Sequence, residues 1–104
     1  MRSTYDQLGD LKGVLAGIRR LRGVSEPRPG IFYLGQVPFL HFHRKDGARW
    51  ADVRSGRDWG PPILIPSNIG EGARVELLRT VRRRHGETLT ALAARRARRR
   101  PGAG

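Results

Sequence analysis

The chain has 104 residues, enough for one domain with one hydrophobic core, and it contains no cysteine, which excludes disulfides and thiolate metal sites. No apolar run is long enough to span a bilayer, and the first residues lead into a polar amphipathic segment rather than a signal peptide. We therefore expect a cytoplasmic protein with no membrane partner.

The formal net charge of +12 is unevenly distributed along the chain. Residues 79–100 carry nine arginines and one acidic residue, Glu87, whereas residues 1–78 carry twelve basic and eight acidic residues. A basic segment of this kind is typical of nucleic-acid binding. A neutral explanation also exists, because 19 arginines against only Lys12 and Lys45, with 14 glycines, are what a GC-rich genome would encode.

Residues 4–22 are predicted to form an amphipathic helix. Gly9, Gly13 and Gly17 weaken it, but their regular spacing leaves a flat stripe suited to close packing against a sheet. Gly23 is the expected end of the helix, and residues 26–30 are predicted to be a stiff linker. The buried face is formed by apolar residues at helical spacing: Leu8, Leu11, Val14, Leu15, Ile18 and Leu21.

Short extended runs follow, and they predict an antiparallel sheet. The Asp46-Gly47 dipeptide lies between two runs of aromatic and β-branched residues, which is the strongest short-range hairpin signal in a sequence. Residues 56–62 are predicted to be a loop. The predicted strands are residues 31–34, 37–44, 48–55 and 63–65.

A second helix is expected from Ser67-Asn68, with Asn68 as N-cap, to Gly86 as C-cap. The predicted fold class is α+β, with an N-terminal helix, a three- to four-stranded antiparallel meander and a C-terminal helix packed on one sheet face. Residues 1–86 are expected to form this single domain. Residues 87–104 are expected to be an Arg/Ala-rich tail, helical or disordered.

The hairpin register determines which side chains share a face of the sheet. A two-residue turn sets His41 opposite Asp52 and His43 opposite Trp50. The helices then cover Leu40, Phe42, Ala51 and Val53, while Phe39 joins the two histidines, Trp50 and Asp52 on the opposite face. Trp59 is expected to close over that face or to plug the end of the sheet. The candidate ligand-binding residues are His41, His43, Trp50, Asp52 and Trp59.

Three chemistries could use this face. A carboxylate at Asp52 beside His41 would favour the protonated imidazole, for acid–base work, for an anionic ligand, or simply to stiffen the sheet. The His-x-His pattern directs both rings to one side, with Asp52 or His85 as a third metal ligand. The hairpin lacks thiolates and further spaced ligands, so we predict no metal site, no cofactor and no complete catalytic set.

The second candidate surface is electrostatic. Arginines in the second helix and the tail would contact phosphates without reading sequence, and the binding would weaken steeply with salt. The candidate nucleic-acid-binding residues are Arg79, Arg82, Arg83, Arg84, Arg95, Arg96, Arg98, Arg99 and Arg100.

Two resemblances accompany these patterns. Phe39-Leu40-His41-Phe42-His43, Gly47 and Ala51-Asp52-Val53-Arg54 resemble a FLHFH…G…ADVR core found in small uncharacterised bacterial proteins. This resemblance extends over about residues 8–85 and implies a shared α+β domain with no known activity. The order of elements is also similar to that of compact toxin ribonucleases with a double-stranded-RNA-binding-like fold. Those enzymes carry Gly-Ser-His before the hairpin, whereas Pro38-Phe39-Leu40 precede His41 here.

The sequence therefore favours a small binding or interaction module that uses the His/Trp/Asp sheet face. Its ligand or protein partner is unknown, and a homodimer through a sheet edge is one arrangement. Nucleic-acid binding through the C-terminal arginines is the alternative. A His-dependent ribonuclease or a metal-dependent hydrolase is a further hypothesis, so enzymatic activity is not the leading expectation.

Overall fold

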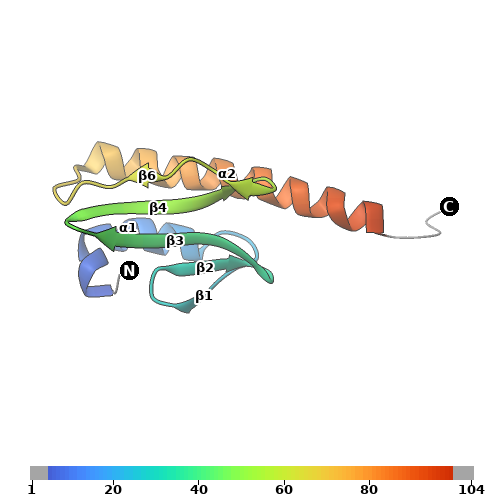
Figure 1. Ribbon diagram of the computed structural model, residues 1–104, viewed down its shortest axis with the longest axis horizontal. Coiled ribbons are helices and arrows are strands. Elements are labelled where there is room, and N and C mark those ends of the chain that lie inside the picture. The colour runs from blue at the N-terminus through green and yellow to red at the C-terminus, as the bar shows by residue number, and fades with distance from the viewer. Residues whose placement is uncertain (1–4, 100–104) are drawn as a thin grey trace.

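The computed structural model describes residues 5–99 (Figure 1). Along the chain, one helical segment precedes a run of strands and another follows it. The first segment begins as a 3₁₀ helix and continues as an α-helix. The elements in chain order are η1 (Tyr5–Leu11), α1 (Lys12–Arg19), β1 (Val24–Arg28), β2 (Ile31–Leu34), β3 (Val37–Lys45), β4 (Ala48–Ser55), β5 (Asp58–Trp59), β6 (Ile63–Leu64) and α2 (Glu71–Arg99).

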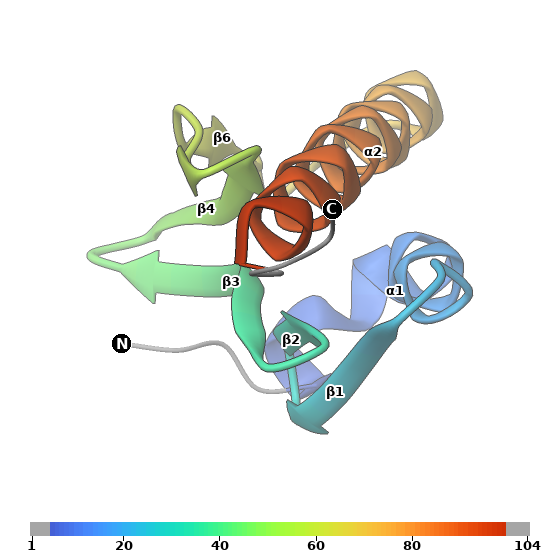
Figure 2. The same cartoon turned by 90° about the vertical axis from the view of Figure 1, so that its right-hand side faces the viewer.

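The strands form one antiparallel sheet in the order β1–β2–β3–β4–β5, and β6 also pairs with β4. Both α1 and α2 lie over the same face of this sheet, and the other face carries no helix among the described residues (Figure 2). The predicted α+β class, with the C-terminal helix packed on one sheet face, is confirmed. The sheet has six strands rather than three or four.

The central hairpin has the predicted register. His41 pairs with Asp52 and His43 with Trp50 across β3 and β4. Asp46 and Gly47 have φ angles of 52° and 79°, the left-handed conformation that a type I′ turn requires at both central positions. This turn fixes which side chains face the helices, and the buried set is the predicted one: Leu40, Phe42, Ala51 and Val53.

Phe39 is the exception on this hairpin, because it lies in the core rather than on the open face. The pairing of β2 with β3 shifts between Phe32↔Leu40 and Tyr33↔Pro38, which leaves Phe39 as an extra residue in β3. Such a bulge places two consecutive side chains on one side of the sheet. Phe39 therefore packs edge-to-face against His85 of α2, with 5.8 Å between ring centroids.

Two short strands replace segments predicted to be irregular. β1 occupies most of the predicted linker and forms the edge of the sheet. Pro27 has no N–H to donate to a neighbouring strand, and an edge strand tolerates this. The Glu26 carboxylate closes the turn into β2 by accepting hydrogen bonds from Gly30 N–H (3.0 Å) and Arg19 Nε (2.6 Å). β5 lies within the predicted loop 56–62 and forms a tight hairpin with β4.

The N-terminal helix is less regular than its apolar periodicity predicts. Only residues 12–19 are α-helical, and residues 5–11 form the 3₁₀ helix, in a segment where Gly9 lowers the α-helical propensity. The glycine stripe does not pack against the sheet. A Cβ on Gly17 would lie 2.6 Å from Leu78 Cδ2, whereas one on Gly9 or Gly13 would meet nothing within 4 Å. The close approach is therefore between α1 and α2, at one glycine.

The second helix is longer than predicted. α2 begins at Glu71, so Asn68 is not its N-cap, and it runs through Gly86 without a break to Arg99. Gly86 therefore does not end the helix, and the boundary expected after it falls inside α2. Contacts beyond this glycine maintain the helix, because Thr88 is fully buried and its Oγ1 accepts a hydrogen bond from Gly56 N–H (3.1 Å). No helix within residues 5–99 has the length and apolarity needed to cross a membrane.

Arg49 ties the start of the chain to the sheet. Its Nη1 and Nη2 atoms donate to the two carboxylate oxygens of Asp10, at 2.8 and 2.7 Å. Nη1 also donates to Gln7 O and Nη2 to Pro66 O, both at 3.0 Å. The Arg49 side chain is only 9% exposed, so this guanidinium is a structural cation that joins η1, β4 and the segment before α2.

This contact predicts a specific pH dependence of stability. The hydrogen bonds from Arg49 hold the pKa of Asp10 below its ordinary value of 3.8. A carboxyl group whose pKa is lower in the folded state contributes stability at pH values above its unfolded-state pKa. That contribution is lost as the pH falls through the folded-state pKa. Urea titrations at neutral and acidic pH would give the difference in unfolding free energy between wild type and Asp10→Asn. This difference should become smaller as the pH falls below 3.8, the ordinary pKa of the carboxyl group. A difference that stays constant would contradict this linkage.

Candidate functional site

The open face of the sheet brings the predicted ligand-binding residues together. Strand period and the confirmed register place His41, His43, Trp50 and Asp52 on this face. β5 adds Trp59, which pairs with Arg54 of β4. All five predicted residues are therefore neighbours on one surface.

Asp52 contacts the side chain of His43. The two residues are diagonal neighbours across the hairpin, and His43 Nε2 lies 3.0 Å from Asp52 Oδ2. The sequence predicted Asp52 opposite His41, which the register confirms, but it did not predict the contact with His43, because a diagonal pair on the same face is also within reach of long side chains. The His41 ring lies between two other rings, with its centroid 5.7 Å from that of His43 and 5.0 Å from that of Trp59.

These contacts make a continuous row of rings along the face. We call Trp50, His43, His41 and Trp59 the ring row. His43 stacks on Trp50 with 5.3 Å between centroids and 25° between planes. At the other end, Arg54 Cζ lies 4.9 Å from the centroid of the Trp59 ring, a cation–π contact. Trp59 is 41% exposed, while His41, His43 and Trp50 are half-buried.

His85 does not join this row as a third metal ligand. It lies on the helix-covered side of the sheet, is 7% exposed and has its Nε2 2.8 Å from Arg22 O. Within the described part of the chain, no three His, Cys, Asp or Glu side chains gather as a metal site would require. The geometry gives His85 a packing role against Phe39 instead.

The predicted nucleic-acid-binding arginines separate into different environments. Arg84 is buried, and its Nη1 donates to Val53 O (3.2 Å) and Pro61 O (3.1 Å). Its assignment as a phosphate contact is therefore wrong, because its place on the inner stripe of α2 directs it into the core. Burial lowers the pKa of the Arg84 guanidinium, and the nearby Arg83 cation lowers it further.

The other predicted arginines within the described residues are exposed on α2. Arg79 forms an ion pair with Glu76 one turn earlier. Arg100 lies outside the described residues. The exposed members of the set are Arg79, Arg82, Arg83, Arg95, Arg96, Arg98 and Arg99.

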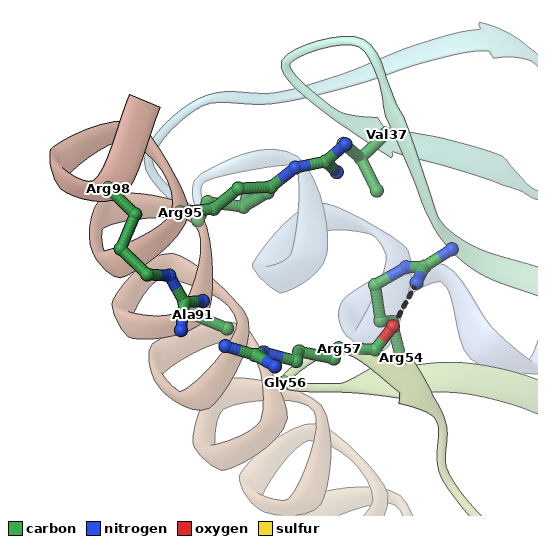
Figure 3. A pocket seen from close by; sticks show the side chains of 8 residues that line it. Val37, Arg54, Gly56, Arg57, Ala91, Arg95 and Arg98 are labelled. Atoms are coloured by element: carbon green, nitrogen blue, oxygen red, sulfur yellow. Dashed lines mark hydrogen bonds between the residues drawn. The ribbon is translucent and has the colours of Figure 1, made fainter. Parts of the chain in front are cut away.

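Two of these arginines line a cavity that the sequence did not reveal. A cavity of about 290 Å³ lies between the turn from β4 to β5 and the C-terminal part of α2 (Figure 3). We call it the arginine pocket, because four of its lining residues are arginines and none is acidic among the residues described there. The lining consists of Arg54, Arg57, Arg95 and Arg98, with Val37, Gly56, Ala91 and Leu92.

The periodicity of α2 explains why Arg95 and Arg98 face the pocket. The inner stripe of the helix contains buried Leu77, Val81, Arg84 and Thr88 at steps of three or four residues. The same steps continue to Leu92, Arg95 and Arg98, so these cations occupy core-facing positions of the helix. α2 extends past the end of the sheet there (Figure 1), so these side chains overhang the pocket instead of being buried.

Arg54 and Arg57 complete the pocket from the sheet, and neither was among the predicted site residues. Arg54 Nε donates to Pro38 O (2.8 Å) and its Nη1 donates to Arg57 O (2.7 Å), which holds the β4–β5 turn in place (Figure 3). Strand period alone would have put Arg54 on the face of Trp50 and Asp52, and this signal could have identified it. Arg54 also joins the two candidate surfaces, because it contacts Trp59 and lines the arginine pocket.

Comparison with known proteins adds no family to this geometry. The resemblance to small bacterial proteins with a FLHFH…G…ADVR core therefore stays a prediction. No family model, no curated protein and no solved structure matches this chain.

Proposed function

We propose that this protein binds nucleic acid through the phosphate backbone, with the arginine pocket as the site for one phosphate group. The observation that carries the proposal is the convergence of Arg54, Arg57, Arg95 and Arg98 on one cavity with no carboxylate in its described lining. Guanidinium groups bind phosphate with paired, charge-assisted hydrogen bonds, so an arginine cluster is suited to this group.

The electrostatics of the pocket favour an anionic ligand. Four like charges around one cavity repel one another, and exposure of Arg57, Arg95 and Arg98 to solvent only partly screens that repulsion. A bound phosphate would replace the repulsion with attraction. Glu87, the nearest acidic residue along the helix, does not line the pocket and instead accepts a hydrogen bond from Ser55 Oγ (2.8 Å).

A polymeric ligand fits better than a small anion because the basic surface continues beyond the pocket. Arg96 and Arg99 are exposed on the same turns of α2, and Arg82 and Arg83 are exposed earlier in the helix. With a net charge of +12, such a surface attracts a phosphate backbone over several contacts. Non-enzymatic nucleic-acid binding thus accounts for the pocket and the helix together.

The test compares two double variants with the same change in charge. Arg95→Ala/Arg98→Ala removes two pocket arginines, and the control Arg20→Ala/Arg44→Ala removes two exposed arginines that do not line the pocket. Binding of a fluorescent single strand and a duplex would be measured by anisotropy over a salt series. The pocket variant should bind about tenfold or more weakly near 50 mM salt, with a salt slope shallower by about 1.5, while the control changes far less.

Two outcomes would overturn the proposal. If both double variants lose the same affinity, net charge rather than the pocket determines binding. If the wild-type protein binds neither oligonucleotide at near-physiological salt, the protein does not act on nucleic acid.

A further inference from the structure

The ring row leads directly into the arginine pocket. Its last ring, Trp59, pairs with Arg54 across β4 and β5, and the Arg54 guanidinium lies 4.9 Å from the centre of that ring. Arg54 is also part of the pocket lining. A phosphate held in the pocket would therefore lie one side chain away from an aromatic surface.

The end of this aromatic surface nearest the pocket is accessible to solvent. Both helices cover the opposite face of the sheet, and no helix of the described residues lies over the face that carries the ring row (Figure 2). Trp59 is 41% exposed, although the three phenylalanines of the chain are each at most 1% exposed. The fold thus buries its phenylalanine rings and leaves this indole next to a cationic pocket.

Rings beside a phosphate site have a specific use with nucleic acid. Unpaired bases stack on exposed aromatic side chains while the backbone follows a basic groove, whereas a duplex keeps its base faces within its own stack. We infer that the protein prefers single-stranded nucleic acid, with a phosphate in the arginine pocket and the adjoining base stacked on Trp59. This inference rests on the proposed function and adds the strand type and the residue that reads it.

The experiment uses Trp59→Ala in the full chain, with Leu64→Ala as the matched control. Leu64 is 76% exposed and pairs with Trp50, so it is an accessible apolar residue on the same face that lies outside the ring row. Affinities for a single strand of about 12 nucleotides and for the corresponding duplex would be measured by anisotropy. Thermal unfolding by circular dichroism would verify that both variants are folded.

The expected result is a selective loss. Wild type should bind the single strand more tightly than the duplex, and Trp59→Ala should weaken single-strand binding by about tenfold while duplex binding stays unchanged. Leu64→Ala should behave as wild type, and Trp59→Phe should retain most of the single-strand affinity.

Other results would overturn the inference. Equal weakening of single-strand and duplex binding would mean that Trp59 only supports Arg54, and tighter duplex binding by wild type would mean that no base stacks on the face. If Arg95→Ala/Arg98→Ala weakens binding but Trp59→Ala does not, this inference is wrong and the proposed function stands. If wild type binds neither probe, both are wrong.

Discussion

Replacing Arg49 with alanine should lower the free energy of unfolding by about 1–3 kcal/mol, a sizeable part of the stability of a domain this size. The substitution leaves the Asp10 carboxylate without its bidentate partner and removes the donor to Gln7 O and Pro66 O. Gln7 O is partly buried, and a buried acceptor that loses a donor keeps part of its cost of desolvation, whereas Asp10 and Pro66 O are open to water. Urea unfolding at neutral pH, followed by circular dichroism, would measure the loss.

The matched control for this substitution is Arg49→Lys. Lysine keeps the positive charge, but its single ammonium cannot reach both Asp10 oxygens and the two carbonyl groups at once. Its stability should therefore lie between those of wild type and the alanine variant. Surface substitutions commonly change the free energy of unfolding by no more than about 0.5 kcal/mol. If the alanine variant stays within that range of wild type, Arg49 does not hold the N-terminal segment.

Arg84→Met should lower stability by about 2 kcal/mol and leave nucleic-acid affinity unchanged. The guanidinium satisfies Val53 O and Pro61 O in a site so tight that a Cβ on Gly60 would lie 2.7 Å from Arg84 Nη1. Methionine fills part of the space but donates no hydrogen bond. Urea unfolding gives the stability, and anisotropy under conditions where the variant stays folded gives the affinity.

The neighbouring arginine provides the control. Arg83 is exposed one position earlier in α2, so Arg83→Met removes the same charge and should change stability by at most about 0.5 kcal/mol. If Arg84→Met weakens nucleic-acid binding while Arg83→Met does not, the structural assignment of Arg84 is wrong. The pair separates a cation that supports the fold from one that is free to meet a ligand.

The hairpin shows how much a sequence can determine locally. An Asp-Gly turn has few alternatives, so the pairing of His43 with Trp50 and the buried face of β3 and β4 could be predicted from strand period. Phe39 could not be placed in this way, because the bulge that inserts it into the core depends on the pairing of β3 with β2. Bulges are set by the neighbouring strand, and a strand read alone does not contain that information.

The helical segments show the complementary limit. Gly86 has the sequence character of a helix end, yet burial of Thr88 and its contact with the β4–β5 turn keep α2 continuous. Tertiary contacts of this kind outweigh the cost of about 1 kcal/mol for glycine inside a helix. The candidate site follows the same rule. Its rings on β3 and β4 could be predicted from the hairpin, whereas the arginine pocket joins β4, its turn and α2 across more than thirty residues of sequence.

Because α2 is continuous, an insertion within it would rotate every residue that follows. Each residue of α2 turns the helix by about 100°. Inserting one residue after Leu92 would keep every arginine and the total charge, yet it would rotate Arg95 and Arg98 away from the pocket. Whether these arginines line the pocket therefore depends on their angular position around the helix, and not on their number. A GC-rich genome raises the number of arginines, but it does not select their positions around a helix.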